Sequence, residues 1–276
     1  MEGSIAAGDR HARVFAALME PDPQRKCAAT AQLWVDWQAG RLRPEADAPP
    51  VARVAVAGRP ARPELVPPRE VPRRGLGSAA GRVALIHAVA HIEFNAVNLA
   101  LDAVYRFREM PEAFAGDWLR IAAEEARHFG LVSDRLAELG RAYGDFPAHN
   151  GLWEMACKTD HDVLLRMALV PRVLEARGLD VTPGMIERLS AAGDRETVAV
   201  LEVILREEIG HVAAGSHWYA YLCRARGLEP EATFRELVKT HAPGYVQGPL
   251  HAAGRLAAGF SEMELAGLEA LRHPQE

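Results

Sequence analysis

The feature of this sequence that most constrains its fold is a repeated pairing of an acidic and an imidazole side chain. Glu125-Ala-Arg-His128 and Glu208-Ile-Gly-His211 each place a glutamate and a histidine three residues apart, so on a helix both side chains leave the same face. A further glutamate precedes each pair, with Glu93 32 residues before Glu125 and Glu175 33 residues before Glu208. The chain therefore repeats one unit, a helix with a glutamate followed by a helix with Glu-x-x-His.

The glutamates of this repeat fall on faces that are otherwise apolar. Segments 86–104, 114–139 and 201–222 carry apolar residues at helical spacing, and one glutamate of the repeat lies inside each apolar stripe. An unpaired charge in such a position costs several kcal/mol, or the group becomes neutral through a pKa shift. A pair of divalent cations removes this problem, because their four positive charges balance the four glutamates.

The combination of residues predicts a dinuclear metal site. Four carboxylates and two imidazoles are the ligands that di-iron and di-manganese helix bundles project into their cores. The candidate ligands are Glu93, Glu125, His128, Glu175, Glu208 and His211. A single Glu-x-x-His pair on a helix is more often solvated than metal-bound. Glu175 lies close to the predicted helix end at Gly178, where an exposed acid is also compatible with the sequence. No catalytic residue is assigned.

Length and composition indicate an ordinary globular protein. The 276 residues can form one large domain or two modest ones, and 49% of them are hydrophobic while 25% are charged. The net charge of −5 argues against a surface built wholly for nucleic acid. The three cysteines contain no C-x-x-C pair, so neither a disulfide framework nor a zinc knuckle is predicted. Charged residues at 9–13 interrupt any apolar leader. We expect a soluble, cytoplasmic protein without membrane association, and the oligomeric state is not assigned.

The chain reads as helical over most of its length. Residues 4–39 are predicted to be helical, with a break at Pro21-Asp22-Pro23. Further helices are predicted at about 79–109 (capped by Ser78), 112–139, 151–177, 183–192, from Asp194 to near Gly227, 230–240 and 261–271. Pro171 should kink the helix at 151–177 one turn before Glu175. The sequence contains no clear strand pattern.

A proline- and arginine-rich stretch at 44–77 interrupts the helical pattern. Residues 51–77 contain five prolines and six arginines against two glutamates, which favours extended backbone. Its apolar residues could lie on a helical surface, and they are Val51, Val54, Val56, Leu65, Val66 and Val71. We therefore predict a strap, defined here as residues 44–77, that wraps over the helices. Its arginines fit an anionic partner or, more simply, a solvated surface.

The surroundings of the proposed ligands suggest redox chemistry but no substrate. Iron is the leading metal and manganese the alternative, since both accept carboxylate and imidazole ligands. Glu124 and Glu207 precede the ligand glutamates; each could accept the free N–H of a metal-bound histidine or be solvated. The small residues near the histidines, Gly130, Gly210 and Gly215, could leave room for a ligand cavity.

Several other histidines are left outside the ligand set. A second polar row on the helix at 79–109 comprises His87, His91, Asn98 and Asp102. It could pair with the strap, face water or form part of a substrate entrance. His161 precedes Glu175 by 14 residues, about 21 Å along a continuous helix, which is too far for direct ligation.

Four stretches carry a resemblance to known proteins: His87-Ala-Val-Ala-His91-Ile-Glu93, Glu124-Glu125-Ala-Arg-His128-Phe129, residues 166–180 and Glu207-Glu208-Ile-Gly-His211-Val212. On these stretches the chain resembles the ferritin-like di-iron carboxylate superfamily. More closely, it resembles the bacterial ferritin-like family catalogued as domain of unknown function 455. The resemblance implies a ferritin-like four-helix core and a metal pair, with no established substrate.

The expected architecture is therefore all-α. A ferritin-like four-helix bundle at 78–228 would carry the N-terminal helices and strap (1–77), as part of the same domain, and a C-terminal helical extension (229–276). Relatives within the superfamily differ from this chain: Val132 stands where a radical-storing reductase subunit would have tyrosine, and the rubredoxin-type Cys-x-x-Cys of rubrerythrins is absent. Iron-storage ferritins lack the strap and the extension.

Three functions are compatible with these features. The leading hypothesis is an oxygen-dependent di-iron oxidoreductase that takes dioxygen and a small-molecule substrate, with two iron ions or, alternatively, manganese. A second is a non-catalytic metal-binding or iron-handling protein. A third is an RNA-modifying enzyme similar to the tRNA hydroxylases, whose partner would be tRNA bound through the strap arginines.

Overall fold

The computed structural model describes residues 10–44, 48–71 and 75–272. Within these ranges the regular secondary structure is helical, with an isolated parallel bridge between Leu65 and Ala148, so the predicted all-α class is confirmed. The chain clusters into two compact units, Met1–Cys157 and Lys158–Glu276. Each unit is described separately.

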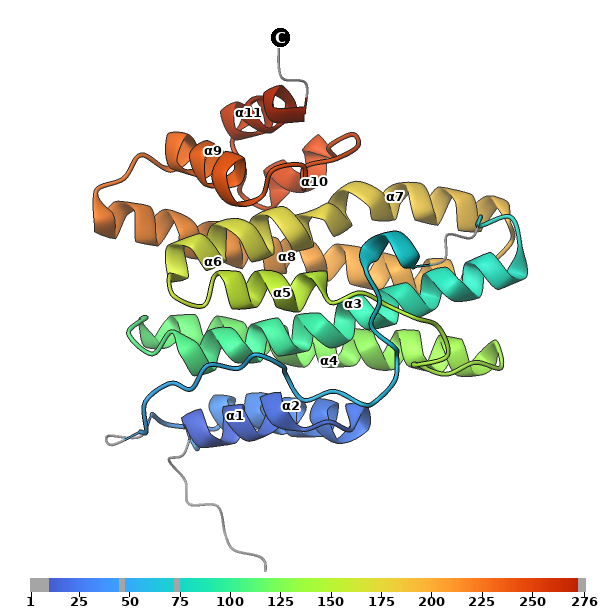
Figure 1. Cartoon of the computed structure of the whole chain (residues 1–276), viewed down its shortest axis with the longest axis horizontal. Helices are drawn as coiled ribbons and strands as arrows, with labels where there is room; N and C mark the ends of the chain where they lie inside the picture. Colours follow the sequence, from blue (N-terminus) through green and yellow to red (C-terminus); the bar gives the residue numbers. More distant parts are fainter. Residues whose placement is uncertain (1–9, 45–47, 72–74, 273–276) are drawn as a thin grey trace, which may run out of the picture. The chain divides into compact units, whose positions relative to one another are not determined.

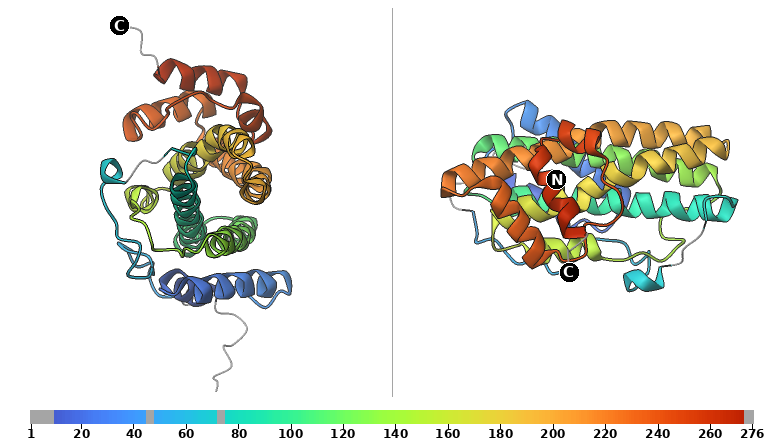
Figure 2. Two further views of the ribbon diagram at one scale, coloured as in Figure 1. Left: turned by 90° about the vertical axis from the view of Figure 1, so that its right-hand side faces the viewer. Right: turned by 90° about the horizontal axis from the view of Figure 1, so that it is seen from above.

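The first unit is built around a long helical hairpin. Its elements are α1 (Arg10–Met19), α2 (Pro23–Gln38), the 3₁₀ turn η1 (Pro68–Glu70), α3 (Ala79–Arg106), α4 (Glu112–Glu138) and α5 (Gly151–Lys158), which ends at the unit boundary. Helices α3 and α4 lie side by side, with α1 packed on α3 and α2 packed on α4 (Figure 1). The end-on view in Figure 2 shows the α1–α2 layer beside the hairpin.

Local signals set the ends of these helices as predicted. Asp22 accepts a hydrogen bond from the Arg25 backbone N–H at 2.9 Å and begins α2 at the proline-flanked break. Ser78 accepts from the Gly81 N–H at 3.0 Å and caps α3.

Helix α3 is buried at every position from 93 to 105. By length and composition it could cross a membrane, but most of its apolar window is buried inside the protein, which is equally typical of a core helix.

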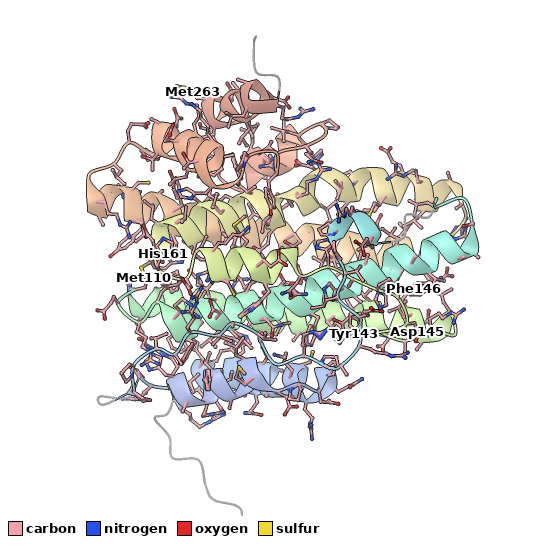
Figure 3. All side chains as sticks on the ribbon, in the orientation of Figure 1. Met110, Tyr143, Asp145, Phe146, His161 and Met263 are labelled. Atoms are coloured by element: carbon pink, nitrogen blue, oxygen red, sulfur yellow. The ribbon has the colours of Figure 1, made fainter. Side chains whose placement is uncertain are left out.

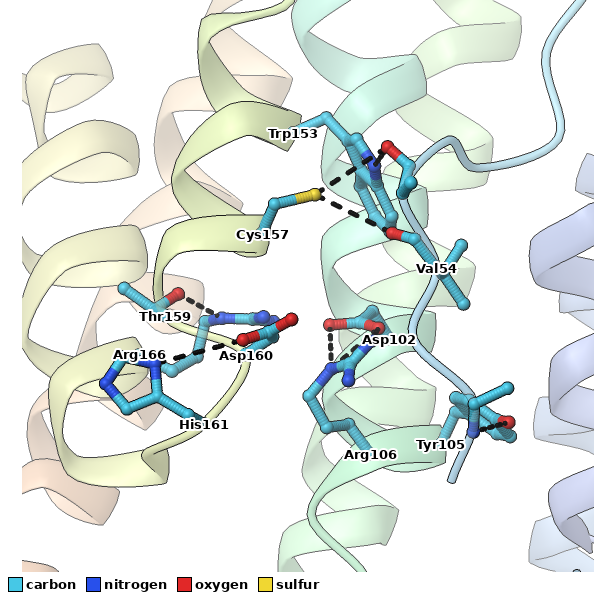
Figure 4. Close-up of polar contacts among 12 residues, drawn as sticks. Val54, Asp102, Tyr105, Arg106, Trp153, Cys157, Thr159, Asp160, His161 and Arg166 are labelled. Atoms are coloured by element: carbon cyan, nitrogen blue, oxygen red, sulfur yellow. Dashed lines mark hydrogen bonds and ion pairs between the residues drawn. The ribbon is translucent and has the colours of Figure 1, made fainter. Parts of the chain in front are cut away.

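The described part of the strap lies on the helices of the first unit. The Ala52 N–H donates to the Tyr105 hydroxyl of α3 at 2.8 Å, and the Gly58 N–H donates to the Leu18 carbonyl of α1 at 3.0 Å. The Trp153 indole of α5 donates to the Ala55 carbonyl at 3.1 Å (Figure 4). These hydrogen bonds tie the extended backbone at 52–58 to α1, α3 and α5.

The apolar residues predicted to hold the strap down do not all do so. Val54 is 5% exposed, whereas Val56 is 59% exposed. Part of the strap's attachment therefore comes from backbone hydrogen bonds, because an extended segment leaves N–H and C=O groups that need partners.

The second unit contains α6 (Val163–Leu169), a π-helical segment η2 (Val170–Glu175), α7 (Ala176–Ala191), α8 (Arg195–Arg226), α9 (Pro230–His241), α10 (Ala252–Ala257) and α11 (Glu262–Arg272). Helices α6 and α7 and the η2 segment between them pack along α8, while α9 and α11 pack together (Figure 2). Asp194 caps α8, and Gly227 ends it in the left-handed conformation at φ +65°.

The predicted continuous helix at 151–177 is wrong. The backbone leaves the helix at 159–162 and begins again at α6. Asp162 accepts from the Leu164 N–H at 2.8 Å as an N-cap, and its carboxylate pairs with Arg226 of α8 at 2.7 Å. Because Asp162 is engaged as a cap and as an ion-pair partner, a new helix starts there.

The predicted helix end at Gly178 and the separate helix at 183–192 are also wrong. Helix α7 continues through Gly178 and contains Pro183 in its interior. Proline there removes one backbone hydrogen bond, but the buried side chains of Leu179 and Leu189 flank it, and α7 packs along α8. Tertiary packing thus outweighs a local preference. Helix α10 was not predicted.

Candidate metal centre

A group of two carboxylates and one imidazole lies inside the α3–α4 hairpin. Glu93 of α3 is 3% exposed, Glu125 of α4 is 1% exposed and His128 of α4 is fully buried. The His128 Nδ1 atom lies 3.3 Å from Oε2 of Glu93 and 3.4 Å from Oε2 of Glu125. One ligand atom of each side chain lies within 4.8 Å of the others. Three such donors within that distance can hold a metal ion.

The electrostatics of this group favour a positive charge between the carboxylates. Burial, the largest single influence, disfavours the imidazolium. The hydrogen bonds and negative charges of Glu125 and Glu93 together outweigh it and raise the pKa of His128 to about 10. The protonated ring thus serves as the counter-charge of the two acids. A divalent cation could take over that role, since metal binding requires the imidazole to lose its proton.

The second Glu-x-x-His pair has a similar local geometry in the second unit. Glu208 and His211 lie on α8, where His211 is fully buried and the Glu208 side chain is 13% exposed. Oε1 of Glu208 lies 3.6 Å from Nδ1 of His211. The helical spacing of three residues therefore brings acid and imidazole together on α8 as it does on α4.

Glu175 does not lie at a frayed helix end. It is the last residue of the π-helical segment η2, it is half-buried, and α7 continues directly from it. The predicted kink at Pro171 falls within this π-helical segment, which spans Val170–Glu175. Such turns occur frequently at functional sites.

The second acid of the first motif has a partner of its own. Glu124 pairs with Arg120, one turn earlier on α4, at 2.7 Å, and its side chain is partly exposed. This i, i+4 pair is a helix-surface feature. The result favours the solvated alternative for Glu124 over a role beside His128.

The polar row on α3 holds the loop that follows α4. The His87 Nε2 atom accepts from the Gly144 N–H at 2.9 Å. The ring nitrogens of His91 lie 2.9 Å from the Tyr143 hydroxyl and 3.0 Å from the His149 carbonyl. Burial lowers the pKa of both histidines, that of His91 to about 4. Figure 3 labels Tyr143 in this loop. The two neutral rings thus fix the loop on α3.

The remaining members of the row also have protein partners. Asn98 accepts from the Lys26 ammonium of α2 at 2.5 Å, and Asp102 pairs with Arg106 at 2.8 Å (Figure 4). The cavity beside Asn98 and His91 has a volume of about 10 Å³, enough for one water molecule. A substrate entrance at this row is therefore not supported.

Sequence reasoning missed several buried cations among the described residues, including Lys26 and Arg172. Lys26 and Arg172 are each 1% exposed or less. A lysine or arginine in a helix ordinarily indicates a solvated face, so the sequence did not predict that these side chains are buried.

His161, which was left outside the ligand set, is mostly exposed beside Asp160 in the turn before α6 (Figure 4).

Fold and site together define an all-α protein with a buried carboxylate–imidazole group suited to a metal ion. The chain belongs to the family described as "Protein of unknown function (DUF455)", whose model matches residues 19–266. A protein of Haemophilus influenzae described as "Uncharacterized protein" is 45% identical over 262 residues, which cover 92% of this chain and 91% of the relative. No solved structure matches the chain. The family description names no activity.

Proposed function

We propose that this chain is a di-metal carboxylate protein of the ferritin-like type, and that it is an oxygen-dependent oxidoreductase acting on a small molecule. The observation that carries the proposal is the buried placement of Glu93, Glu125 and His128 around one point. A buried pair of acids with a single imidazolium retains excess negative charge, which a divalent cation neutralises.

The second half of the proposed centre comes from the repeat. We propose that Glu208 joins Glu93, Glu125 and His128 as a ligand, with Glu175 and His211 completing the set. In this arrangement two helical hairpins face each other as a four-helix bundle. Glu93, Glu125, Glu175 and Glu208 would supply the carboxylate ligands of the two metals, and His128 and His211 the imidazole ligands.

Iron is the proposed metal and manganese the alternative, because both accept mixed carboxylate and imidazole ligands. A reduced iron pair supplies electrons to dioxygen when it is bound. The chain's own contribution is to hold the ligands in a buried, water-poor position and to fix the direction of each carboxylate.

Metal analysis of matched variants tests the ligand assignment. Purified protein loaded anaerobically with ferrous iron or manganous ion should hold two metals per chain. Glu125→Ala and Glu208→Ala should lose half or more of this metal. Glu124→Ala and Glu207→Ala, which change the neighbouring acids on the same helices, should retain it. Full metal content in both ligand variants would refute the assignment.

Oxygen uptake separates the enzyme from an iron-handling protein. If the protein is an oxidoreductase, ferrous iron beyond two equivalents should not be oxidised and retained, and oxygen uptake by the loaded protein should rise when substrate candidates are added. Continued oxidation and retention of excess iron would instead establish iron handling.

The RNA-modifying alternative predicts that tRNA co-purifies with the protein. Arg53 and Arg62 of the strap are both exposed, and neutralising them should abolish this co-purification.

A further inference from the structure

The π-helical segment η2, which ends at Glu175, is attached to α8 at two successive residues. The first attachment is steric. A Cβ atom added at Gly215 would lie 2.4 Å from Cβ of Pro171 and 2.5 Å from its Cγ. The α8 backbone therefore touches the proline ring directly, and no residue with a side chain fits at this position. The sequence-based expectation that Gly215 leaves room for a ligand cavity is wrong, because Pro171 fills that space.

The second attachment is the buried guanidinium of Arg172. Its Nη2 donates to Oε1 of Glu264 on α11 at 2.7 Å, and its Nε donates to the Ser216 hydroxyl of α8 at 3.2 Å. The Arg172 and Glu264 side chains are 2% and 6% exposed. Burial lowers the pKa of Arg172, and the charge of Glu264 opposes that effect. The ion pair thus lies inside the second unit.

Aromatic rings surround the same guanidinium. Its central carbon lies 4.6, 4.1 and 4.4 Å from the ring centroids of Tyr219, Phe234 and Phe260. These rings come from α8, α9 and the segment between α10 and α11. Arginine over an aromatic face is favourable. One side chain of the π-helical segment is therefore held by α8 and by the C-terminal helices together.

A buried ion pair is a poor way to gain stability alone, because desolvation offsets most of its attraction and an apolar side chain would anchor a helix as well. What the pair adds is direction, because the planar guanidinium of Arg172 makes hydrogen bonds of defined geometry to α8 and α11 and these contacts limit rotation of the η2 segment. Arg172 lies three residues before Glu175 in the same π-helical turn. Rotation of this turn would change where the Glu175 carboxylate points.

We propose that Arg172 and Glu264 are positioning residues that fix the direction of Glu175, so that the C-terminal helices serve the metal centre without touching it. The inference rests on the proposed function, in which Glu175 is a ligand of one metal. Groups that hydrogen-bond directly to a metal ligand commonly change metal affinity by about 10- to 100-fold when they are altered, and residues that act through the backbone of the ligand should lie near the lower end of this range.

The test is a titration of the full chain with manganous ion, followed by electron paramagnetic resonance and calorimetry. The central variant is Glu264→Gln. It removes the charge, and glutamine can still accept the Ser261 backbone N–H hydrogen bond that glutamate makes at 3.0 Å at the start of α11. We expect Glu264→Gln to weaken one of the two metals about tenfold or more and to leave the other unchanged. Glu175→Gln should weaken the same metal.

A second buried ion pair in this unit provides the matched control. Nη2 of Arg255 lies 2.8 Å from Oδ2 of Asp180, and the two side chains are 3% and 1% exposed. The pair joins α10 to α7 and does not involve the π-helical segment. Asp180→Asn should lower the melting temperature as Glu264→Gln does, yet bind both metals as the wild type does. Equal loss of metal in the two variants would mean that Glu264 acts only through stability.

A double-mutant cycle separates positioning from general destabilisation. Once Glu175 is gone, loss of Glu264 should weaken metal binding no further, so the two effects should be strongly non-additive. Additive effects, or wild-type affinity in Glu264→Gln, would overturn the inference. If Glu264→Gln does not fold, Ser216→Ala, which removes the weaker hydrogen bond to Arg172, should show the same selective loss on a smaller scale. Binding of no metal by the wild type would refute the proposed function itself, whereas an unchanged Glu175→Gln variant would refute only the role of Glu175.

Discussion

The Nδ1 atom of His128 lies 3.3 Å from Oε2 of Glu93, although the two residues belong to different helices. The contact joins α3 to α4 through an imidazole that is fully buried and an acid that is nearly so. Glu125, one turn before His128, adds a second carboxylate at 3.4 Å. Without metal, the imidazolium balances part of this negative charge.

The first prediction concerns that balance. His128→Leu should destabilise the metal-free protein by about 3–5 kcal/mol, because removing one partner leaves buried charge uncompensated. Urea unfolding of metal-free protein measures the effect. Arg127→Ala, an exposed position beside it on α4, should change stability by no more than about 0.5 kcal/mol. Equal effects of the two substitutions would contradict a special role for the buried ring.

The second prediction concerns metal and melting temperature. A ligand that binds only the folded state stabilises it by about 2.7 kcal/mol at a concentration of 100 Kd. Ferrous or manganous ion should therefore raise the melting temperature of the wild type. The rise should be much smaller in Glu93→Gln, where one buried acid of the group is neutral. A wild-type midpoint that stays constant at saturating metal would count against a buried site.

The third prediction concerns Lys26 and pH. Burial lowers the pKa of Lys26 from 10.5 to about 7, while the negative charge of Glu20 opposes the shift. Between these two values the unfolded chain binds a proton that the folded protein does not. The Lys26 contribution to stability should therefore rise with pH from 7 to 10.5, with a slope of up to about 1.4 kcal/mol per pH unit.

Unfolding in urea at several pH values measures this slope. The difference in unfolding free energy between wild type and Lys26→Met should grow in favour of the wild type as pH increases through this window. A flat curve for Lys26→Met would show that the ammonium is not desolvated.

The fourth prediction compares two glycines. A Cβ atom added at Gly58 would lie 2.2 Å from the Met19 carbonyl carbon, whereas one added at Gly130 of α4 meets nothing within 4 Å. Gly58→Ala should therefore destabilise the protein and loosen the strap, which limited proteolysis would detect. Gly130→Ala should stabilise α4 by about 0.5–1 kcal/mol, since alanine favours helix. A neutral Gly58→Ala would show that the strap does not depend on this close approach.

Much of the first unit could be predicted from local patterns. The proline-flanked break before α2, the Ser78 cap and the pairing of Glu125 with His128 each depend on residues within one or two turns of one another. The proximity of Glu93 to His128 could also be predicted, because a short connection at 107–111 forces α3 and α4 into an antiparallel hairpin. The roles of His87 and His91 could not, since their partners lie in a loop more than 50 residues away.

The second unit shows where local reasoning stops. Pro171 predicted a kink, but the π-helical turn that contains it packs against Gly215 and is held through Arg172 by α8 and α11, and these partners are more than 40 residues away in the sequence. The start of α6 at Asp162 could not be predicted from local patterns either, because Asp162 pairs with Arg226, which lies 64 residues later in the sequence.

The sequence by itself determined the helical class of this protein and the pairing of each glutamate with its histidine, because the 3.6-residue period is a local property of the backbone. The tertiary structure decided where the helices are interrupted, which cations are buried and how the backbone before Glu175 is held. Local helix preferences differ by less than about 1 kcal/mol per residue, proline excepted. Long-range packing and buried ion pairs involve several kcal/mol, so they prevail wherever the two disagree.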